Sequence, residues 1–361
     1  MKLVMTLLVR NEADVVDAQL AFHLAAGVDF VLATDNRSDD GTTEILERYE
    51  RAGRLLLLHE PGDDMRQAEW VTRMARLAAV EHGADWVVNS DADEFWWPRG
   101  GSLKDVLSLV PERYGVVRGA WRHFLPRPES AGADVFERMT VRLCAPAHPG
   151  DKATIHHAHQ KVAHRGVPDV EVEPGNHDVR GSGLEPLRGW HPMEILHFSL
   201  RSPSQVESKS RGGWLRNPGY EATLHQTRLD RARATSAVDR FFEQHVVDDE
   251  LLEAGLGAGT LAIDTRLRDA LRQLRGAGGF RVAGLDERLL EFGTPSVEDS
   301  AAFVAEIAPL LEIDGAVRAE ARADALERRL QALERAWPRP LGRAFALRAG
   351  PLVGRRRLAR R

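Results

Sequence analysis

Cysteine is almost absent from this chain: Cys144 is the only one in 361 residues. A single thiol excludes an intrachain disulfide framework and favours a reducing compartment. No apolar run reaches the roughly 18–20 residues that a membrane-spanning helix needs. The apolar run between Lys2 and Arg10 lacks both a long hydrophobic segment and a small-residue cleavage site, so it indicates a buried strand rather than a signal peptide.

The excess of acidic over basic residues is also small, since the formal net charge is −5 at pH 7. Such a small excess does not favour nucleic acid or another polyanion as a partner. Lysine is rarer still: the 49 basic residues include only Lys2, Lys104, Lys152, Lys161 and Lys209, which leaves 44 arginines. A lysine that persists against this bias hints that an ammonium group is required at its position. We expect a cytoplasmic protein.

The first hundred residues alternate between short apolar runs and amphipathic segments. Strands are expected at 2–9, 28–34, 54–60 and 84–90, and helices at 12–27, 42–53 and 66–83. Fully apolar strands alternating with helices predict a mostly parallel sheet that is covered on both faces. The fold class is therefore α/β, and ligands in such sheets bind at the carboxyl ends of the strands.

The rest of the chain changes character. Later strands are expected at 115–121, 139–143 and 193–200, and the polar segment 148–200 holds eight of the fourteen histidines. The pattern becomes helical from about residue 221, which predicts an α/β domain at 1–218 and a helical region at 219–337. Residues 338–361 contain eight arginines and no acid. This basic tail is either solvated or, through its interleaved apolar side chains, in contact with the inner face of the plasma membrane.

Three carboxylates lie within four positions of one short stretch, "NSDADEFWW". Asp91, Asp93 and Glu94 follow an apolar strand and precede three aromatic side chains at 95–97. If the strand continues to residue 93, Asp91 and Asp93 project to the same side. Carboxylate oxygens suit Mg²⁺ or Mn²⁺, so the position predicts a divalent metal site rather than a solvated acidic turn.

A second polar stretch, "TDNRSDDGT", ends the strand expected at 28–34. Asp35 is well placed to accept hydrogen bonds from a base or a ribose. The residues at 38–41 supply a turn and the start of a helix. We therefore expect ligand contact from Asp35 and turn chemistry from its neighbours.

Together these stretches carry a family resemblance. The order of Arg10-Asn11-Glu12, "DNRSDDGT" and "DADEF" resembles the family 2 glycosyltransferases, most closely a bacterial subgroup whose motif reads D-x-D-E-F. The resemblance covers roughly residues 1–215. It implies the GT-A fold, a nucleotide-sugar donor of the UDP or GDP class, and a divalent metal that bridges the donor diphosphate at the D-x-D. It also implies transfer of the sugar to a hydroxyl of a saccharide or lipid-linked acceptor.

The resemblance also implies roles for particular residues. Asp35 corresponds to the uridine-contacting aspartate, and Asp91 and Asp93 to the ribose- and metal-contacting pair. Donor contacts are expected from Arg10, Glu12, Asp35, Arg66 or its neighbour Gln67, Asp91, Lys161, Arg201 and Lys209, and metal contacts from Asp91, Asp93 and His197. A metal held by carboxylates at a diphosphate stabilises the charge that grows as the leaving group departs.

An inverting transfer also needs a general base near the acceptor hydroxyl. The chain has no clear equivalent of the Glu-Asp pair that family 2 members often use. His177 beside Asp178 is one candidate. Glu94 is another, and the alternative for Glu94 is an anchor of the turn. Trp96, Trp97 and Trp121 either stack on a sugar ring or belong to the core.

Two other functions compete with glycosyl transfer. A nucleotidyltransferase uses a similar sheet, but it usually carries a glycine-rich basic loop after the first strand, where this chain has "RNEAD". A non-catalytic module that binds a sugar or a nucleotide is the second alternative. The histidines at 152–166 do not favour structural zinc, because no cysteine accompanies them, and a polar acceptor groove is the better interpretation.

Overall fold

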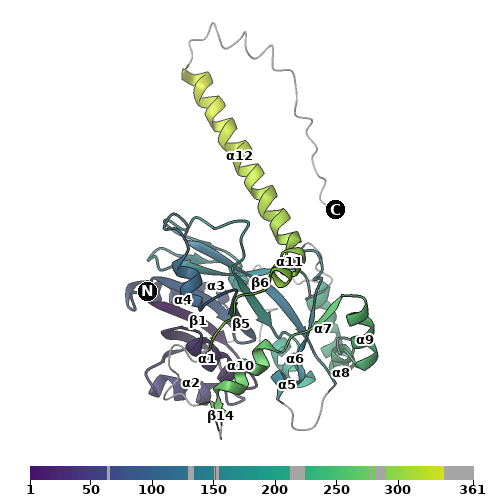
Figure 1. Ribbon diagram of the computed structural model, residues 1–361. Helices are drawn as coiled ribbons and strands as arrows, with labels where there is room; N and C mark the ends of the chain where they lie inside the picture. The colour runs from purple at the N-terminus through teal and green to yellow at the C-terminus, as the bar shows by residue number, and fades with distance from the viewer. Residues whose placement is uncertain are drawn as a thin grey trace. The chain divides into compact units, whose positions relative to one another are not determined.

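The computed structural model describes residues 1–62, 66–128, 134–149, 151, 154–211, 224–276, 279–280 and 290–336. The chain forms two compact units, Met1–Leu311 and Glu312–Arg361. The first unit contains the sheets and most of the helices, and the described part of the second unit belongs to the long helix α12 (Ala308–Ala336) (Figure 1). The boundaries expected near residues 218 and 337 stay predictions of where the chain changes character.

The first unit begins with the alternation that the apolar runs predict. Its strands are β1 (Leu3–Val9), β2 (Phe30–Asp35), β3 (Leu55–His59) and β4 (Trp86–Asp91), and the helices between them are α1 (Val16–Ala25), α2 (Thr42–Arg51) and α3 (Gln67–Val80). The four strands pair in parallel in the order β3-β2-β1-β4. The parallel arrangement is confirmed for this half of the sheet.

Strand β1 shows why helices cover both faces. Leu3, Met5 and Leu7 belong to one core cluster, which includes buried side chains of α1 and α2. Val4 and Leu8, which alternate with them, belong to a second cluster with side chains of α3. Because successive side chains of a strand point to opposite faces, apolar side chains on both faces require a packed layer on each side.

Strands with mostly antiparallel neighbours complete the sheet. They are β5 (Glu94–Pro98), β6 (Val116–Leu125), β7 (Val141–Leu143), β8 (Gln160–Arg165), β11 (Met193–His197) and β12 (Leu261–Ile263). Strand β8 pairs antiparallel with β4 and β6, whereas β11 pairs in parallel with β6 and antiparallel with β5. The ten-stranded sheet is therefore mixed, and the predicted α/β class with flanking helices and a helical C-terminal region is confirmed.

Short elements and further helices surround the sheet. They are α4 (Leu103–Ser108), α5 (Val135–Arg138), β9 (Glu171–Val172), the 3₁₀ turn η1 (Pro174–Asn176), β10 (Val179–Arg180), α6 (Pro203–Arg211), α7 (Leu224–Ala234), α8 (Val238–Glu243), α9 (Asp249–Gly257), α10 (Arg266–Leu274), β13 (Arg275–Gly276), β14 (Gly279–Phe280) and α11 (Val297–Glu306). The turn η1 lies between β9 and β10, which pair antiparallel, and its Asn176 contacts Asp91 at the end of β4.

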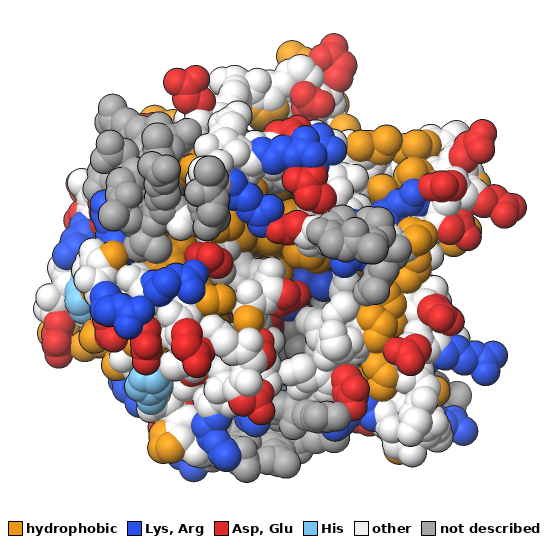
Figure 2. Space-filling model, turned by 90° about the horizontal axis from the view of Figure 1, so that it is seen from below, with side chains coloured by type: hydrophobic (Ala, Val, Ile, Leu, Met, Phe, Trp, Pro, Cys, Tyr) orange, Lys and Arg blue, Asp and Glu red, His pale blue; other side chains and the backbone are white. Residues whose placement is uncertain are grey.

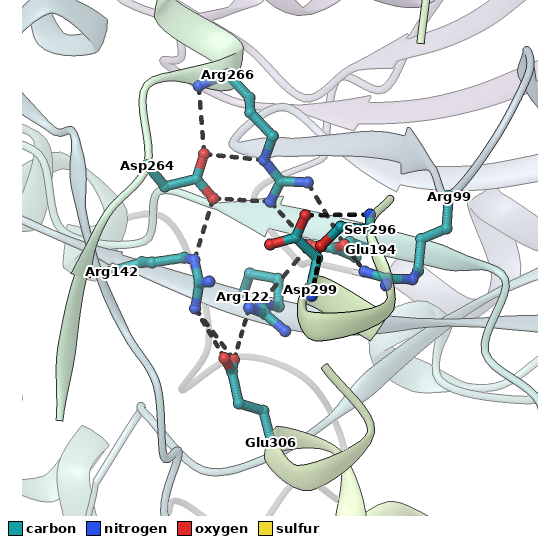
Figure 3. A network of polar contacts seen from close by, with 9 residues as sticks. All are labelled: Arg99, Arg122, Arg142, Glu194, Asp264, Arg266, Ser296, Asp299 and Glu306. Carbon is teal, nitrogen blue, oxygen red and sulfur yellow. Dashed lines mark hydrogen bonds and ion pairs between the residues drawn. The ribbon is translucent and has the colours of Figure 1, made fainter. Parts of the chain in front are cut away.

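A buried network of ion pairs joins the late helices of the first unit to the sheet (Figure 3). Arg122 of β6 pairs with Glu306 of α11 at 2.6 Å, and Arg142 of β7 pairs with the same carboxylate at 3.1 Å. Arg266 at the start of α10 pairs with Glu194 of β11 at 2.9 Å. Buried charges need such partners, so the network holds α10 and α11 against strands from the middle of the chain.

Candidate active site

The turns that follow β1 and β2 are tied to each other. Asn11 donates its backbone N–H to the Ser38 hydroxyl at 3.0 Å, and its side chain exchanges hydrogen bonds with Asp39. The backbone N–H of Glu12 donates to the Thr42 hydroxyl at 2.9 Å. Asn11 has a φ of 56°, in the left-handed region that asparagine tolerates better than most residues. The two motifs therefore form one rigid edge at the carboxyl ends of adjacent parallel strands.

Asp35, the last residue of β2, is almost fully buried at this edge. One of its oxygens accepts from the backbone N–H and the hydroxyl of Ser38, at 3.1 and 2.6 Å. The other accepts from the Thr43 hydroxyl at 2.6 Å. These bonds make Asp35 an organiser of the turn and of the first residues of α2, and its contact with a base stays a prediction.

Strand β4 ends at Asp91, and Ala92 and Asp93 form the turn into β5. The expectation that the strand continues to residue 93 and points both aspartates the same way is wrong. Pairing of Glu94 with His197 of β11 starts a new antiparallel strand, which forces the chain to turn directly after Asp91. The two aspartates accordingly take different partners.

Asp91 contacts two residues that lie far away in the sequence. Lys161 of β8 places its ammonium 2.5 Å from one carboxylate oxygen, and the Asn176 amide donates to the other at 3.2 Å. The Lys161 side chain is 1% exposed. Burial alone would lower the pKa of Lys161, but the nearby carboxylates of Asp91 and Glu94 raise it above its usual value, so the lysine is charged.

Glu94 is fully buried and serves as an internal partner of this cluster. It lies 3.1 Å from the Lys161 ammonium, and it accepts hydrogen bonds from the Trp121 indole at 3.0 Å and from the backbone N–H of Asp91 at 3.2 Å. Burial raises the pKa of Glu94 to about 8, against the opposing effect of Lys161. This environment favours a role of Glu94 as an anchor of the turn over a role as general base, because a buried carboxylate has no direct access to an acceptor hydroxyl.

Asp93 lies in a second ionic cluster on the same turn. Its carboxylate is 3.8 Å from Nε2 of His197 and 3.5 Å from the Arg201 guanidinium. Arg201 is 1% exposed and also pairs with Glu12 and, at 2.6 Å, with Asp14. Burial tends to lower the pKa of Arg201, but these carboxylates raise it, so its charge is held inside the protein. Arg201 thus joins the end of β1 to the turn that carries Asp93.

Asp93 and His197, both expected as metal ligands, are brought together by the fold, with 3.8 Å between a carboxylate oxygen of Asp93 and Nε2 of His197. Their binding of a metal stays a prediction. Within the described ranges, no group of three or more His, Cys, Asp or Glu side chains is gathered that could hold a metal. An ion held by only two protein ligands would leave positions for substrate oxygens, as Mg²⁺ sites usually do.

His177 follows η1 and faces the same region. Its Nδ1 lies 2.8 Å from the backbone carbonyl of Gln160, and its ring stacks on His159 with a centroid distance of 3.6 Å. A carbonyl only accepts, so Nδ1 carries the proton in the neutral ring. The neighbouring Asp178 accepts from Arg118 at 3.1 Å. The Gln160 carbonyl therefore orients His177, a feature that the sequence does not reveal.

Trp121 of β6 lies at the centre of a group of imidazoles. It stacks on His197 with a centroid distance of 4.4 Å and an angle of 30°, and the rings of His123, His159 and His177 lie 5.1–5.5 Å away. Trp96, in contrast, is fully buried in the core. The signal in the sequence was the concentration of histidines in 148–200, and the fold gathers several of them around one indole ring that also contacts Glu94.

The remaining donor candidates have varied positions. Gln67 is buried and accepts from the backbone N–H of Gly175 at 3.0 Å, whereas its neighbour Arg66 is half exposed and pairs with Glu69 at 3.6 Å. Arg10 donates to Asn36 at 3.3 Å. The side chain of Lys209 and the whole basic tail 338–361 lie outside the described residues. Gln67, rather than Arg66, holds the loop that carries Asn176 and His177.

The surface and the helices add two findings. In Figure 2, acidic and basic side chains alternate over the face shown, which agrees with the small net charge and does not favour a polyanionic partner there. None of the described helices has the length and apolar character to cross a membrane. A cavity of about 890 Å³ lies among α6, α7 and α8, and it is lined by none of the predicted site residues.

Comparisons with known proteins give only distant likenesses. No family model and no curated protein matches the sequence. The structure of S. aureus TarS 1–349 in complex with UDP is 14% identical over 67% of this chain and 72% of that chain, with a TM-score of 0.30. Glucosyl-3-phosphoglycerate synthase from Mycobacterium tuberculosis with Mg²⁺ and UDP is 18% identical over 33% of this chain and 43% of that chain, with a TM-score of 0.23.

The length of these matches is also limited. Another structure of S. aureus TarS 1–349 is 14% identical and has a TM-score of 0.27, and the chain spans about half its length, 47%. Because the TM-scores are this low, the function has to be drawn from the contacts of the site itself.

Proposed function

We propose that this chain is a glycosyltransferase that moves a sugar from a nucleotide-diphosphate donor to a hydroxyl group of a saccharide or lipid-linked acceptor. The observation that carries the proposal is the separation of 3.8 Å between Asp93 and His197 at the carboxyl edge of the parallel strands. Asp91, at the end of β4, borders the same turn. The resemblance of "RNE", "DNRSDDGT" and "DADEF" to family 2 glycosyltransferases, and hence to the GT-A fold, supports it.

The turn after β1 disfavours the alternative that this chain is a nucleotidyltransferase. Phosphate loops after a first strand need glycines, so that the backbone can approach the phosphates, and usually a basic side chain. Here the equivalent turn is closed by hydrogen bonds of Asn11 with Ser38 and Asp39, and Glu12 is bound to Arg201. This turn is built to hold carboxylates in place rather than to surround a triphosphate.

Asp93 and His197 would hold a divalent metal, with Asp91 beside them for the ion or the ribose of the donor. Bound there with the diphosphate, Mg²⁺ or Mn²⁺ supplies positive charge that stabilises the leaving group. The chain's own part is to keep the carboxylates fixed. Lys161 compensates the charge of Asp91, and Arg201 compensates that of Asp93.

The general base in this proposal is His177. The Gln160 carbonyl holds the proton on Nδ1 at 2.8 Å, which leaves the lone pair of the neutral ring on Nε2. Nε2 would accept the proton of the acceptor hydroxyl as the oxygen attacks the sugar. Asp178 has a supporting role, because it is bound to Arg118 on the neighbouring strand β6. Trp121 and the surrounding imidazoles would form one wall of the acceptor groove.

The test begins with donor binding. We expect UDP or GDP to raise the melting temperature of the full chain only when Mn²⁺ or Mg²⁺ is present. Asp93→Asn and His197→Asn should each remove this metal-dependent shift and lower donor hydrolysis roughly 100-fold. Glu81→Gln, an exposed acid outside the site, is the control that should change neither. The proposal fails if no nucleoside diphosphate or nucleotide sugar binds in a metal-dependent way.

A second assay separates binding from catalysis and distinguishes the alternatives. His177→Asn should lower sugar transfer or hydrolysis by roughly 100-fold while leaving the metal-dependent melting shift intact. Exposed His59→Asn is its matched control. Release of pyrophosphate from UTP or GTP with a sugar phosphate would identify a nucleotidyltransferase instead. Metal-dependent donor binding with no turnover of any nucleotide sugar would identify a non-catalytic module.

The cellular place is part of the same proposal. A nucleotide-sugar donor and a single cysteine fit the cytoplasm, and a lipid-linked acceptor would require the enzyme to work at the inner face of the plasma membrane. The eight arginines of residues 338–361 would supply attraction to anionic lipids.

A further inference from the structure

Helix α12 exposes a line of large apolar side chains. Leu326, Leu330 and Leu333 are 61%, 60% and 53% exposed. Their spacing of four and three residues puts them on the same face of the helix. The described part of the second unit consists of this helix alone, so that unit offers the leucines no described cover. Clustered leucines facing water mark a surface that binds a partner.

From Ala316 to Leu333 the sequence of α12 follows a heptad repeat. The a positions are Ala316, Ala323 and Leu330, and the d positions are Ala319, Leu326 and Leu333. The e positions next to the stripe carry Glu320 and Glu327, and the g positions on the other side carry Arg322 and Arg329. An apolar a/d stripe between charged e and g positions is the pattern of a coiled coil.

We infer that α12 forms a parallel, two-stranded coiled coil with the same helix of a second copy of this chain. In a parallel pair, a g residue faces the e residue five positions later on the partner helix. Arg322 of one copy then faces Glu327 of the other, and the symmetry of the pair forms this contact twice. The stripe is therefore complementary in charge to itself.

The charges also decide the direction of the helices and their number. In an antiparallel pair, g faces g and e faces e, which would bring Arg322 toward Arg329 and Glu320 toward Glu327. Like charges in these places disfavour that arrangement. The charged e and g residues also keep the apolar stripe narrow, which fits two helices rather than a larger bundle. This inference does not depend on the proposed function.

The first test is the mass of the full chain in solution, by light scattering and sedimentation equilibrium. We expect twice the chain mass of 40.1 kDa. Leu326→Gln combined with Leu330→Gln should give a monomer, because it makes the stripe polar with residues that still favour a helix. The matched control places glutamines elsewhere on the same helix, Val317→Gln with Ala325→Gln, and should stay dimeric. A monomeric wild-type chain, or a trimer or tetramer, would overturn the inference.

The second test exchanges charges. Arg322→Glu and Glu327→Arg should each weaken the dimer about tenfold, because each replaces two attractive contacts by two repulsive ones. The double variant restores opposite charges and should recover the wild-type dissociation constant. Equal weakening by the single and double variants would contradict the pairing.

The third test measures direction. In a Cys144→Ser background, Ala319→Cys places one thiol at a d position of each helix, where a parallel pair brings the two together. Mild oxidation should convert the dimer to a covalent one. A dimer by mass that does not cross-link through residue 319 would be antiparallel or built elsewhere, and either result would overturn the inference.

Discussion

The ammonium of Lys161 lies 3.1 Å from the carboxylate of Glu94, and each of these side chains is 1% exposed. The pair connects β8 to the first residue of β5, directly after the turn that carries Asp93. Asp91 contacts the same ammonium. One buried cation therefore organises both ends of the acidic turn. Position 161 is one of the five at which the chain has a lysine despite its strong bias toward arginine.

Removal of this cation should destabilise the protein strongly. Lys161→Met removes the buried ammonium that contacts both Asp91 and Glu94, and we expect the free energy of unfolding in urea to fall by about 3–5 kcal/mol. Adding Glu94→Gln should recover part of this loss, because a neutral amide at this buried position needs no cationic partner. Lys104→Met is the control, since Lys104 pairs with Asp29 where both side chains are partly exposed, and its loss should cost about 0–1 kcal/mol. Equal losses from Lys161→Met and Lys104→Met would contradict the role of the buried pair.

The first half of the fold could be predicted because its signals are local. Each parallel strand is a short apolar run, and the helices expected at 12–27, 42–53 and 66–83 correspond to α1, α2 and α3 with shorter ends. Strand β5 was missed because its three aromatic residues and its Glu94 have no strand-like alternation. It exists through pairing with β11, about a hundred residues later, and such pairing leaves no local trace.

The positions of the acids at strand ends were predictable, and the partners of the acids were less so. Asp35 and Asp91 end strands and Asp93 follows one, and strand ends are readable from the sequence. Asn176, which binds Asp91, belongs to no recognisable motif and sits at a φ of 58° after the glycine of η1. Arg201 was expected to face a diphosphate, but its contacts within the described residues include three carboxylates. The ion-pair partners are set by tertiary packing, which spacing does not encode.

The protein should lose stability in mild acid because of three buried histidines. Burial lowers the pKa of His23, His123 and His164 from 6.5 to about 4. As the pH falls below 6.5, these histidines bind protons in the unfolded chain but stay neutral in the folded chain. Stability is therefore lost between pH 6.5 and pH 4. Between pH 7 and pH 5 we expect a loss of roughly 2 kcal/mol for each histidine, measured by urea unfolding.

A single variant isolates one of these contributions. His123→Asn should reduce the dependence of the unfolding free energy on pH by about one third, and the exposed His59→Asn should leave it unchanged. A wild-type free energy of unfolding that is the same at pH 7 and pH 5 would show that the buried rings do not govern acid stability.

The ion-pair network should control the attachment of α11. Glu306 is the shared partner of Arg122 and Arg142, and Phe303 of the same helix lies under the Arg122 guanidinium, 5.3 Å from it. Glu306→Gln leaves two arginines facing each other around a neutral amide. We expect the free energy of unfolding to fall by about 3 kcal/mol. Hydrogen exchange should become faster in α11 relative to the wild type, and more so than in β1.

The control for this helix is Glu298→Gln. Glu298 is an exposed acid in the first turn of α11, so its loss should cost less than about 1 kcal/mol. If both variants change exchange in α11 equally, the network does not hold the helix. A loss of stability without faster exchange in α11 would place its effect elsewhere in the sheet.

The basic tail should bind anionic membranes, and pairing of two chains should strengthen that binding. Residues 338–361 hold eight arginines, and each arginine near an anionic surface contributes about 1 kcal/mol at moderate salt. Full-length protein should pellet with phosphatidylserine vesicles and be released by high salt, whereas a 1–337 truncation should stay in solution. Vesicles of phosphatidylcholine alone are the control for both proteins.

Leu326→Gln with Leu330→Gln should weaken pelleting of the full chain, because a monomer brings one tail instead of two to the same surface. Equal pelleting of the full chain and the truncation would remove the tail from the membrane proposal, and equal pelleting of the dimer and the glutamine variant would show that the tails act singly.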